Sequence, residues 1–316
     1  MKNSKIIATG EYLPKKVLTN KDLEKIFDTS NEWIVSRTGI HQRHIVGEGQ
    51  VTSDLAHLAA ENLFANCNIK KNEIDLILVA TTTPDKVFPS VACSVQRKLD
   101  INNIPAFDIQ AVCSGFIFAL TTADSFIRAG TYNRILVIGA DCMSSITNYK
   151  DRSNAILWGD GAGALILEAS REEGIIKNII HSDGNYENML HVPRESKNSE
   201  PNKIVMQGNA VFKMAVNTLD QIVDETLANT PYSKKDVDWL VPHQANIRIL
   251  QATAKKLEMS MDQVILTIHK HGNTSAASVP LALNEGISSG KIKPGHLVVM
   301  EAFGGGFTWG STLVRM

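Results

Sequence analysis

Apolar positions along the chain follow two alternating patterns. Four short runs are apolar at nearly every position: Ile74–Thr81, Arg134–Asp141, Val237–Val241 and Leu297–Phe303. Such runs are typical of strands that are covered on both faces of a sheet. Helical spacing of apolar residues instead marks Asp54–Ala65 and Val211–Ala228. The alternation predicts an α/β protein.

A faint internal repeat indicates two similar halves. The segments ILVIGAD, GDGAG and ALILEA follow one another as a strand, a glycine-rich turn and a strand. The segments LVVMEAF, GGG and FTWGSTLV have the same order near the C-terminus. We therefore predict an N-terminal half at residues 1–170 and a C-terminal half at residues 171–316. Glycine-flanked strand pairs are common in α/β proteins, so the repeat needs support from other features.

Composition and charge exclude several classes of protein. The 316 residues are 43% hydrophobic and 21% charged, which is ordinary globular usage. The net charge of −1 argues against a globally basic nucleic-acid-binding protein. The longest charge-free run, Ile109–Ala123, has 15 residues and is too short for a comfortable membrane span. The first residues lack the apolar core of a signal peptide, so we expect a cytoplasmic enzyme.

Cys113 occupies a position that favours a nucleophile. A short extended run leads into it, and from Ser114 to Gly130 the pattern is helical and apolar on nearly all sides. A thiol at the N-terminus of a buried helix meets unpaired N–H groups and the positive end of the helix dipole, which lower its pKa. The alternative, an inert buried cysteine, stays open. Three other cysteines lack this context: Cys67, Cys93 and Cys142.

Two polar residues in the second half are candidate partners for that thiol. His243 directly follows the predicted strand at Val237–Val241, where α/β sheets keep their chemistry. Asn273 lies in a small polar segment that leads into a helix, where it or Thr274 could act only as an N-cap. His243 could equally be a buried core histidine. The nearby pair His269 and His271 lacks a third ligand, so we assign no metal.

The order Cys113, His243, Asn273 has one well-known parallel that the surrounding sequence does not support. The separations of 130 and 30 residues are similar to those of papain-like cysteine proteases. However, no CGSCW segment surrounds Cys113, and the chain has a repeated βα pattern. The glycine-rich segment 303–310 joins two predicted strands. Its backbone could supply an oxyanion-hole donor, although a bulged hairpin explains its composition equally well.

Six long motifs together resemble those of β-ketoacyl-acyl-carrier-protein synthase III, a thiolase-fold family that starts type II fatty-acid synthesis. The matching segments are DTSNEWIVSRTGI (28–40), AVCSGF (111–116), WGDGAGA (158–164), DWLVPHQANIRI (238–249), HGNTSAASVPLAL (271–283) and EAFGGGFTWGS (301–311). The resemblance covers essentially the whole chain. It implies a thiolase-like α/β fold in five layers, αβαβα, with two mixed five-stranded sheets, and a homodimer.

The resemblance also implies the chemistry. Cys113 would take the acyl group from acetyl-CoA or a similar primer, and the backbone N–H groups of Cys113 and Gly305 would hold the oxyanion. Malonyl-acyl-carrier protein would then lose CO₂, and His243 and Asn273 would donate hydrogen bonds to the enolate oxygen. The enolate carbon would attack the acyl-enzyme to give 3-oxoacyl-carrier protein. No metal or other cofactor is implied.

Further site residues are implied by position. Coenzyme A would bind Trp33, Arg37, Arg152, Gly208 and Asn246. The acyl pocket would include Phe88 from the partner subunit, Met143 and Met206. An acidic carrier protein would dock on a basic surface comprising Gln244, Ala245, Asn246, Ile247, Arg248, Lys213, Lys255 and Lys256. The alternative for this surface is an ordinary solvated helix face.

Competing functions make different demands on the sequence. A thiolase would need a second catalytic cysteine, and no cysteine follows Cys142. Elongating condensing enzymes use two histidines, whereas this chain pairs His243 with Asn273. A cysteine protease would hydrolyse peptides, and a binding module would tolerate the loss of Cys113. The length and branching of the primer stay open.

Overall fold

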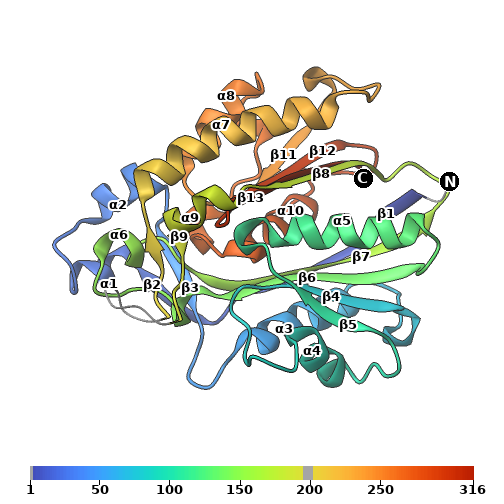
Figure 1. Cartoon of the computed structure of the whole chain (residues 1–316), viewed down its shortest axis with the longest axis horizontal. Coiled ribbons are helices and arrows are strands. Elements are labelled where there is room, and N and C mark those ends of the chain that lie inside the picture. The colour runs from blue at the N-terminus through green and yellow to red at the C-terminus, as the bar shows by residue number, and fades with distance from the viewer. Residues whose placement is uncertain (1–2, 195–201) are drawn as a thin grey trace.

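Five layers of secondary structure stack through the molecule, as Figure 1 shows. The computed structural model describes residues 3–194 and 202–316. One outer layer holds α7 (Gly208–Leu227) and α8 (Ile247–Lys256), and the other holds α3 (Thr52–Ala65) and α4 (Val91–Leu99). The central layer holds α5 (Gly115–Arg128) and α10 (Ser278–Ser288), with one sheet on each side. The predicted thiolase-like order αβαβα is therefore confirmed.

The first sheet has five strands, and its mixed pairing was expected. Their order is β1 (Asn3–Tyr12), β7 (Asp160–Ser170), β6 (Arg134–Cys142), β4 (Leu76–Ala80) and β5 (Ala106–Ile109). The strand β4 is parallel to both β5 and β6, whereas β7 is antiparallel to both β1 and β6. The carboxyl ends of β4, β5 and β6 therefore meet at one edge of the sheet.

The second sheet repeats this pattern with four strands in the described part of the chain. Their order is β8 (Ile175–Ser182), β13 (Thr308–Arg315), β12 (Leu297–Gly304) and β11 (Trp239–Pro242). The pairing directions match those of β1, β7, β6 and β4. The expected fifth strand is reduced to one parallel bridge between Leu240 and Val264.

A buried amide explains why the fifth strand is missing. The side chain of Gln244 donates to the carbonyl oxygen of Ile265 and accepts from the N–H groups of Thr267 and Ile268. These backbone groups are satisfied by a side chain rather than by a strand ladder, so the segment turns away after Val264. The junction between β7 and β8 spans residues 171–174, and the division into halves at 170/171 stays a prediction.

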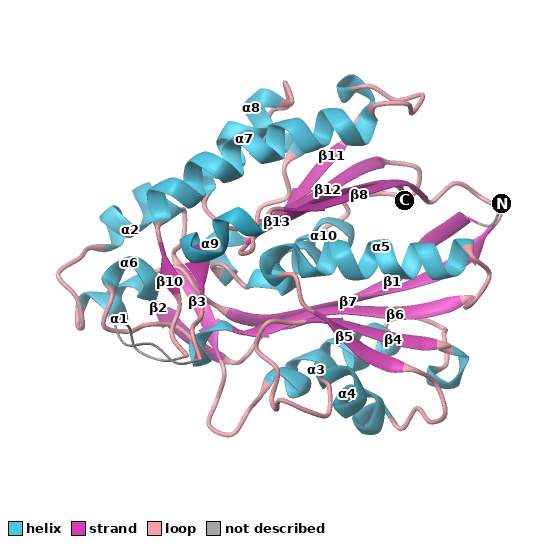
Figure 2. Cartoon of the chain, in the orientation of Figure 1, coloured by secondary structure: helices cyan, strands magenta, loops and turns pink. Residues whose placement is uncertain are grey.

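Smaller elements surround one end of the sheets (Figure 2). Two short hairpins pair β2 (Lys16–Thr19) with β3 (Gln42–Ile45), and β9 (Leu190–His191) with β10 (Val205–Met206). The short helices there are α1 (Asn20–Glu24), α2 (Asn31–Thr38), α6 (Arg152–Ala155) and α9 (Ile268–His271). No helix in residues 3–194 or 202–316 is long and apolar enough to cross a membrane.

The apolar runs bury alternate residues on opposite faces of the sheets. In β4, Leu76 and Leu78 pack against the central helices, whereas Ile77 and Val79 pack against α3 and α4. The strand β12 is likewise buried on both faces. Predicted strands and helices at these segments are confirmed. One detail differs, because the segment GDGAG is not a turn: its residues from Asp160 onward already belong to β7. A Cβ at Gly163 would lie 2.7 Å from the Cβ of Pro280, so this glycine lets α10 approach the strand.

Candidate active site

Cys113 lies in a single turn of 3₁₀ helix, Val112–Ser114, between β5 and the N-terminus of α5. Its side chain is buried at 3% exposure. The preceding residue, Val112, has a φ of +47°, which is unfavourable for a β-branched residue. Such a conformation persists only where the surroundings enforce it, and it is common at functional sites. The predicted strand-to-helix position of the thiol is confirmed.

The thiol is less acidic than the sequence predicted. Burial raises the pKa of Cys113 to about 12, and the nearby charge of Asp141 adds to the rise. The expectation of a lowered pKa at the helix N-terminus is therefore wrong, because burial penalises the charged thiolate more than the neighbouring Ser275 side chain favours it. The raised pKa indicates that the Cys113 side chain is a neutral thiol at physiological pH.

His243 directly follows β11 and is held by the neighbouring strand. Its backbone N–H donates to the carbonyl oxygen of Glu301 in β12 at 2.8 Å. Burial lowers the pKa of the imidazole to about 3, so the ring is neutral at physiological pH. Its Nδ1 atom is buried without a hydrogen-bond partner within the described ranges of the chain. A neutral ring can donate from one nitrogen and accept at the other.

Asn273 is fixed by its backbone and by its own amide oxygen. Its N–H donates to Leu157, and its carbonyl oxygen accepts from Gly159, both at 2.9 Å. Its Oδ1 accepts from the N–H of Ser275 at 2.9 Å, which leaves Nδ2 on the opposite side of the amide. The N-cap alternative holds in part, because Thr274 is the N-cap residue of the 3₁₀ turn Ser275–Ala277 that leads into α10. The N-cap of α10 is Ala277, and Thr274 makes no side-chain capping bond.

The glycine-rich turn packs directly on Cys113. A Cβ at Gly304 would lie 2.7 Å from the backbone nitrogen of Cys113. Gly305 lies next to Leu190 and Val112, because a Cβ there would meet the Leu190 carbonyl oxygen at 2.9 Å and a methyl carbon of Val112 at 3.6 Å. The sequence analysis singled out Gly305 and missed Gly304. Only the close approach of the two backbones reveals it.

Two side-chain hydroxyls join the turn Val112–Ser114 to the glycine-rich turn at residues 304–306. Ser114 Oγ lies 2.8 Å from both the carbonyl oxygen of Ala111 and Oγ1 of Thr308. Thr308 Oγ1 in turn lies 3.0 Å from the carbonyl oxygens of Ala111 and Gly305. The cluster ties together the two backbone segments that flank the thiol.

Cys113, His243 and Asn273 face one cavity of about 740 Å³. They come from three distant segments, so their convergence could not be read from spacing alone. Eight more predicted residues line the same cavity: Trp33, Arg37, Met206, Gly208, Ala245, Asn246, Lys213 and Arg248. The cavity therefore joins the proposed reaction centre to a basic mouth.

The guanidinium groups of two arginines lie against the Trp33 ring at this mouth. The Arg152 Cζ atom lies 4.6 Å from the ring centroid, and that of Arg37 lies 4.9 Å away. Asn246 caps α8 by accepting from Arg248 N–H, and it also donates to the Arg37 carbonyl oxygen at 2.9 Å. That second bond ties α8 to α2.

A second cavity of about 950 Å³ lies beside Ala111 and Val112, the two residues that precede Cys113. Met143 and Gly305 line this cavity rather than the first. Trp158 and Leu190 line both cavities, and the sequence analysis missed both residues. Phe88 lines neither cavity, and 82% of its surface is exposed. Within one chain, the predicted acyl-pocket residues therefore do not converge.

The predicted docking surface is only partly at the surface. Gln244 is 1% exposed, and its amide bonds to Pro242, Ile265, Thr267 and Ile268. Its side chain therefore cannot contact a partner, and that assignment is corrected. Ile247 is half-buried against Gly39. The exposed cations are Lys213, Arg248, Lys255 and Lys256. Arg248 also lies 5.9 Å above the ring of Phe212.

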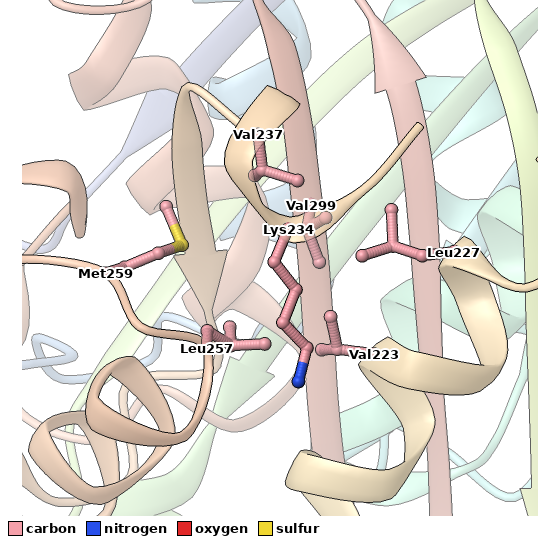
Figure 3. Close-up of a pocket in the computed structure, with 7 residues that line it drawn as sticks. All are labelled: Val223, Leu227, Lys234, Val237, Leu257, Met259 and Val299. Carbon is pink, nitrogen blue, oxygen red and sulfur yellow. The ribbon is translucent and has the colours of Figure 1, made fainter. Parts of the chain in front are cut away.

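A small crevice elsewhere offers no comparable chemistry (Figure 3). It is lined by Val223, Leu227, Lys234, Val237, Leu257, Met259 and Val299. Its single ionisable side chain, Lys234, pairs with Asp224 at 2.7 Å. The described residues contain no group of three or more side chains that could hold a metal ion.

Comparisons with known proteins point to one family. Family models described as 3-oxoacyl-[acyl-carrier-protein] synthase III match residues 107–184, and the C-terminal model of that family matches residues 227–316. The β-ketoacyl-[acyl-carrier-protein] synthase III of Thiobacillus denitrificans is 58% identical, with 100% of both chains covered. The Aliivibrio fischeri protein of that name is 53% identical, with 99% of each chain covered.

Solved structures give the same result. The 3-oxoacyl-[acyl-carrier-protein] synthase III of Aquifex aeolicus has a TM-score of 0.95 and 46% identity, covering 99% of this chain and 100% of its own. The Pseudomonas aeruginosa enzyme has a TM-score of 0.93 and 38% identity, covering 99% and 98%. Family models, relatives and structures thus agree with the family resemblance that the sequence motifs indicated. The chain belongs to the β-ketoacyl-acyl-carrier-protein synthase III family of acyltransferases.

Proposed function

We propose that this chain starts type II fatty-acid synthesis by condensing a primer acyl-CoA, such as acetyl-CoA, with malonyl-acyl-carrier protein. The products are 3-oxoacyl-carrier protein, CO₂ and coenzyme A. The observation that carries this proposal is the shared cavity of Cys113, His243 and Asn273. A nucleophile and two neutral donors suit a reaction that passes through an acyl-enzyme and an enolate.

The first half-reaction transfers the acyl group to Cys113. The sulfur attacks the thioester carbonyl, and the tetrahedral oxyanion accepts from the N–H groups of Cys113 and Gly305. The C–S bond to coenzyme A then breaks, and the thiol proton ends on the departing sulfur. Because the pKa of Cys113 is raised to about 12, this proton leaves during the attack rather than before it.

The second half-reaction forms the carbon–carbon bond. The malonyl carboxylate leaves as CO₂, and its bonding electrons form an enolate whose oxygen accepts from His243 and from Asn273 Nδ2. Neutral donors suit this step, because a protonated imidazole could protonate the carbanion. The enolate carbon attacks the acyl carbonyl, the bond between that carbonyl carbon and the Cys113 sulfur breaks, and the released thiolate takes up a proton from solvent. The low pKa of His243 supports its neutral role.

Substitution of Asn273 separates the two half-reactions. In Asn273→Ala, acetyl-CoA should still acetylate Cys113, because the amide faces the enolate and not the thioester. Discharge by malonyl-carrier protein should fall roughly 100-fold or more, the usual cost of removing one transition-state donor. Rapid-quench measurement of acetyl-enzyme and of labelled CO₂ gives both rates. Equal losses in the two rates would contradict the assigned role.

We assign coenzyme A to the mouth of the cavity. Trp33 presents an aromatic face for adenine, and Arg37 supplies charge for the phosphates. The Arg152 guanidinium over the Trp33 ring must swing aside to let adenine enter between them. Gly208 leaves room beside the pantetheine path, since a Cβ there would meet only a Met206 methyl carbon at 3.9 Å.

We propose a homodimer in which Phe88 of the partner subunit closes the second cavity. Phe88 and its neighbour Val87 are among the most exposed apolar side chains described. The edge strand β5 also exposes Phe107. Light scattering should give twice the 34.6 kDa mass of one chain. A single-chain mass with full activity would contradict this assignment. The cytoplasmic location stays a prediction.

An acidic carrier protein should dock beside the cavity mouth, where Arg248 and Lys213 lie. In Arg248→Glu, KM for malonyl-carrier protein should rise while acetylation of Cys113 by acetyl-CoA stays nearly unchanged. Lys235→Glu makes the same change of charge at an exposed residue that does not line the cavity. It should leave both steps unchanged. An equal loss in both half-reactions of Arg248→Glu would refute docking at this surface.

A further inference from the structure

Asp141, at the end of β6, gathers hydrogen bonds from two separate segments. Its side chain is completely buried at 0% exposure. Oδ1 accepts from the hydroxyls of Thr81 and Thr83 at 3.0 Å, and from the N–H groups of Thr82 at 2.8 Å and Thr83 at 3.2 Å. Oδ2 accepts from the N–H of Ala276 at 3.1 Å. Both carboxylate oxygens are therefore used as acceptors.

The segment held by Oδ2 is the turn that orients Asn273. Ser275 has a φ of +51°, which is unfavourable for a residue with a side chain, and its N–H donates to Asn273 Oδ1. Ala276 follows directly and is anchored to Asp141. Gly139, on the same strand as Asp141, lets this turn approach, because a Cβ there would lie 2.3 Å from the Ala276 carbonyl oxygen. The strained turn is thus held by β6.

We propose that Asp141 is a positioning residue for the condensation step. Its carboxylate holds Ala276 and so fixes the Ser275 turn that aims the Asn273 amide at the enolate. This inference rests on the role proposed for Asn273. It assigns Asp141 no contact with substrate, and it gives the buried carboxylate a task that the acylation step does not require.

The position of Asp141 also predicts the sign of its effect on acylation. Burial raises the pKa of the Cys113 thiol, and the negative charge of Asp141 adds to the rise. Removing that charge by itself therefore favours the thiolate that forms during attack, and it offsets any loss of the Ser275 contact that lowers the same pKa. Loss of the carboxylate should weaken condensation while acylation is preserved. A residue that merely stabilised the fold would weaken both steps together.

Asp160 provides a matched control within the same sheet. It is also completely buried, and it accepts from the N–H groups of Val46 and Ser144 at 2.8 Å and from the Ser144 hydroxyl at 2.6 Å. These donors lie outside the Asn273 turn, and the segment before Asp160 meets Asn273 through backbone hydrogen bonds of Leu157 and Gly159, which the substitution does not remove. Burial raises the pKa of both carboxyl groups, and replacing either aspartate by asparagine turns one acceptor oxygen into a donor. Only Asp141→Asn, however, disturbs the bond to Ala276.

The test compares the two half-reactions in Asp141→Asn and Asp160→Asn. In Asp141→Asn, acetylation of Cys113 by acetyl-CoA should stay within a few-fold of wild type. Discharge by malonyl-carrier protein should fall up to roughly 100-fold, the scale of about 1 Å of misplacement. In Asp160→Asn, the ratio of the two rates should match wild type even if the unfolding temperature falls. The same ratio in both variants would overturn the proposal.

A second measurement covers the case in which Asp141→Asn does not fold. Thr81→Val removes one donor to Asp141 and keeps the shape of the side chain, so discharge should again fall more than acetylation. Hydrogen exchange at the Ala276 amide should be faster in this variant than in Asp160→Asn, and unchanged exchange would overturn the proposal. If malonyl-carrier protein did not discharge the acetyl group from the wild-type enzyme, the proposed function would be refuted instead. Hydrogen exchange does not depend on that activity, so the two failures can be told apart.

Discussion

Adding one methyl group at Gly304 should disable the oxyanion hole without removing any catalytic side chain. The Cβ of Gly304→Ala would lie 2.7 Å from the Cys113 nitrogen and 3.2 Å from both the Cys113 Cβ and the Ser114 nitrogen. An oxyanion accepting from Cys113 N–H needs a similar distance of about 2.7–3.1 Å from the same nitrogen. The methyl group and the oxyanion therefore compete for space beside one N–H group.

Two costs follow from this crowding. The backbone contact cannot be relieved by a rotamer change, so overpacking should lower the free energy of unfolding by about 1–3 kcal/mol. Losing one oxyanion donor should lower the acetylation rate of Cys113 by roughly 100- to 1000-fold. Rapid-quench acetylation with labelled acetyl-CoA measures the rate, and urea unfolding measures the stability.

Gly47→Ala supplies the control, because a Cβ there meets no heavy atom within 4 Å. This variant should acetylate at the wild-type rate. Acetylation of Gly304→Ala within a few-fold of wild type would refute the reasoning, because it would mean that the oxyanion does not lie beside the Cys113 N–H. If the acetylation rate fell while the free energy of unfolding stayed the same, the oxyanion-hole assignment would stand and the predicted overpacking would be wrong.

Two further predictions concern stability. Ser114→Ala removes the bonds to Ala111 and Thr308 but leaves Thr308 two carbonyl acceptors, so we expect the ordinary loss of about 1 kcal/mol in urea unfolding. A loss several times larger would contradict this. Burial lowers the pKa of His243 and of His271 to about 3, against 6.5 in the unfolded chain. The unfolded state therefore binds more protons between these values. Each buried histidine should therefore lower the free energy of unfolding by about 1.4 kcal/mol per pH unit as the pH falls from about 6 toward 4. His271→Asn should flatten that slope, and an unchanged slope would contradict the burial argument.

The sequence predicts the layers well, because strands buried on both faces need apolar residues at every position. Apolar runs such as Leu297–Phe303 therefore predict buried strands from the sequence alone. The missing fifth strand could not be predicted, because it depends on Gln244 reaching across to Ile265, Thr267 and Ile268. A polar residue after a strand has many possible uses, and only the folded chain selects one.

The candidate site was found only in part for similar reasons. The strand-to-helix position of Cys113 is a local feature, so it could be read from one segment. The pKa of its thiol depends on burial by distant residues, and the dipole argument alone gave the wrong direction. The close approach of Gly304 and the hydrogen bonds of Asp141 join segments far apart in the chain, and no local pattern reports them.

The most direct test of the account is the intact mass of the protein after mixing with acetyl-CoA. Wild type should gain one acetyl group, mapped to the peptide that contains Cys113, and Cys113→Ser should gain none. Addition of malonyl-carrier protein should then remove the adduct from wild type and yield 3-oxobutanoyl-carrier protein. The absence of any adduct across a panel of short, long and branched acyl-CoAs would contradict the central claim that Cys113 carries the acyl group.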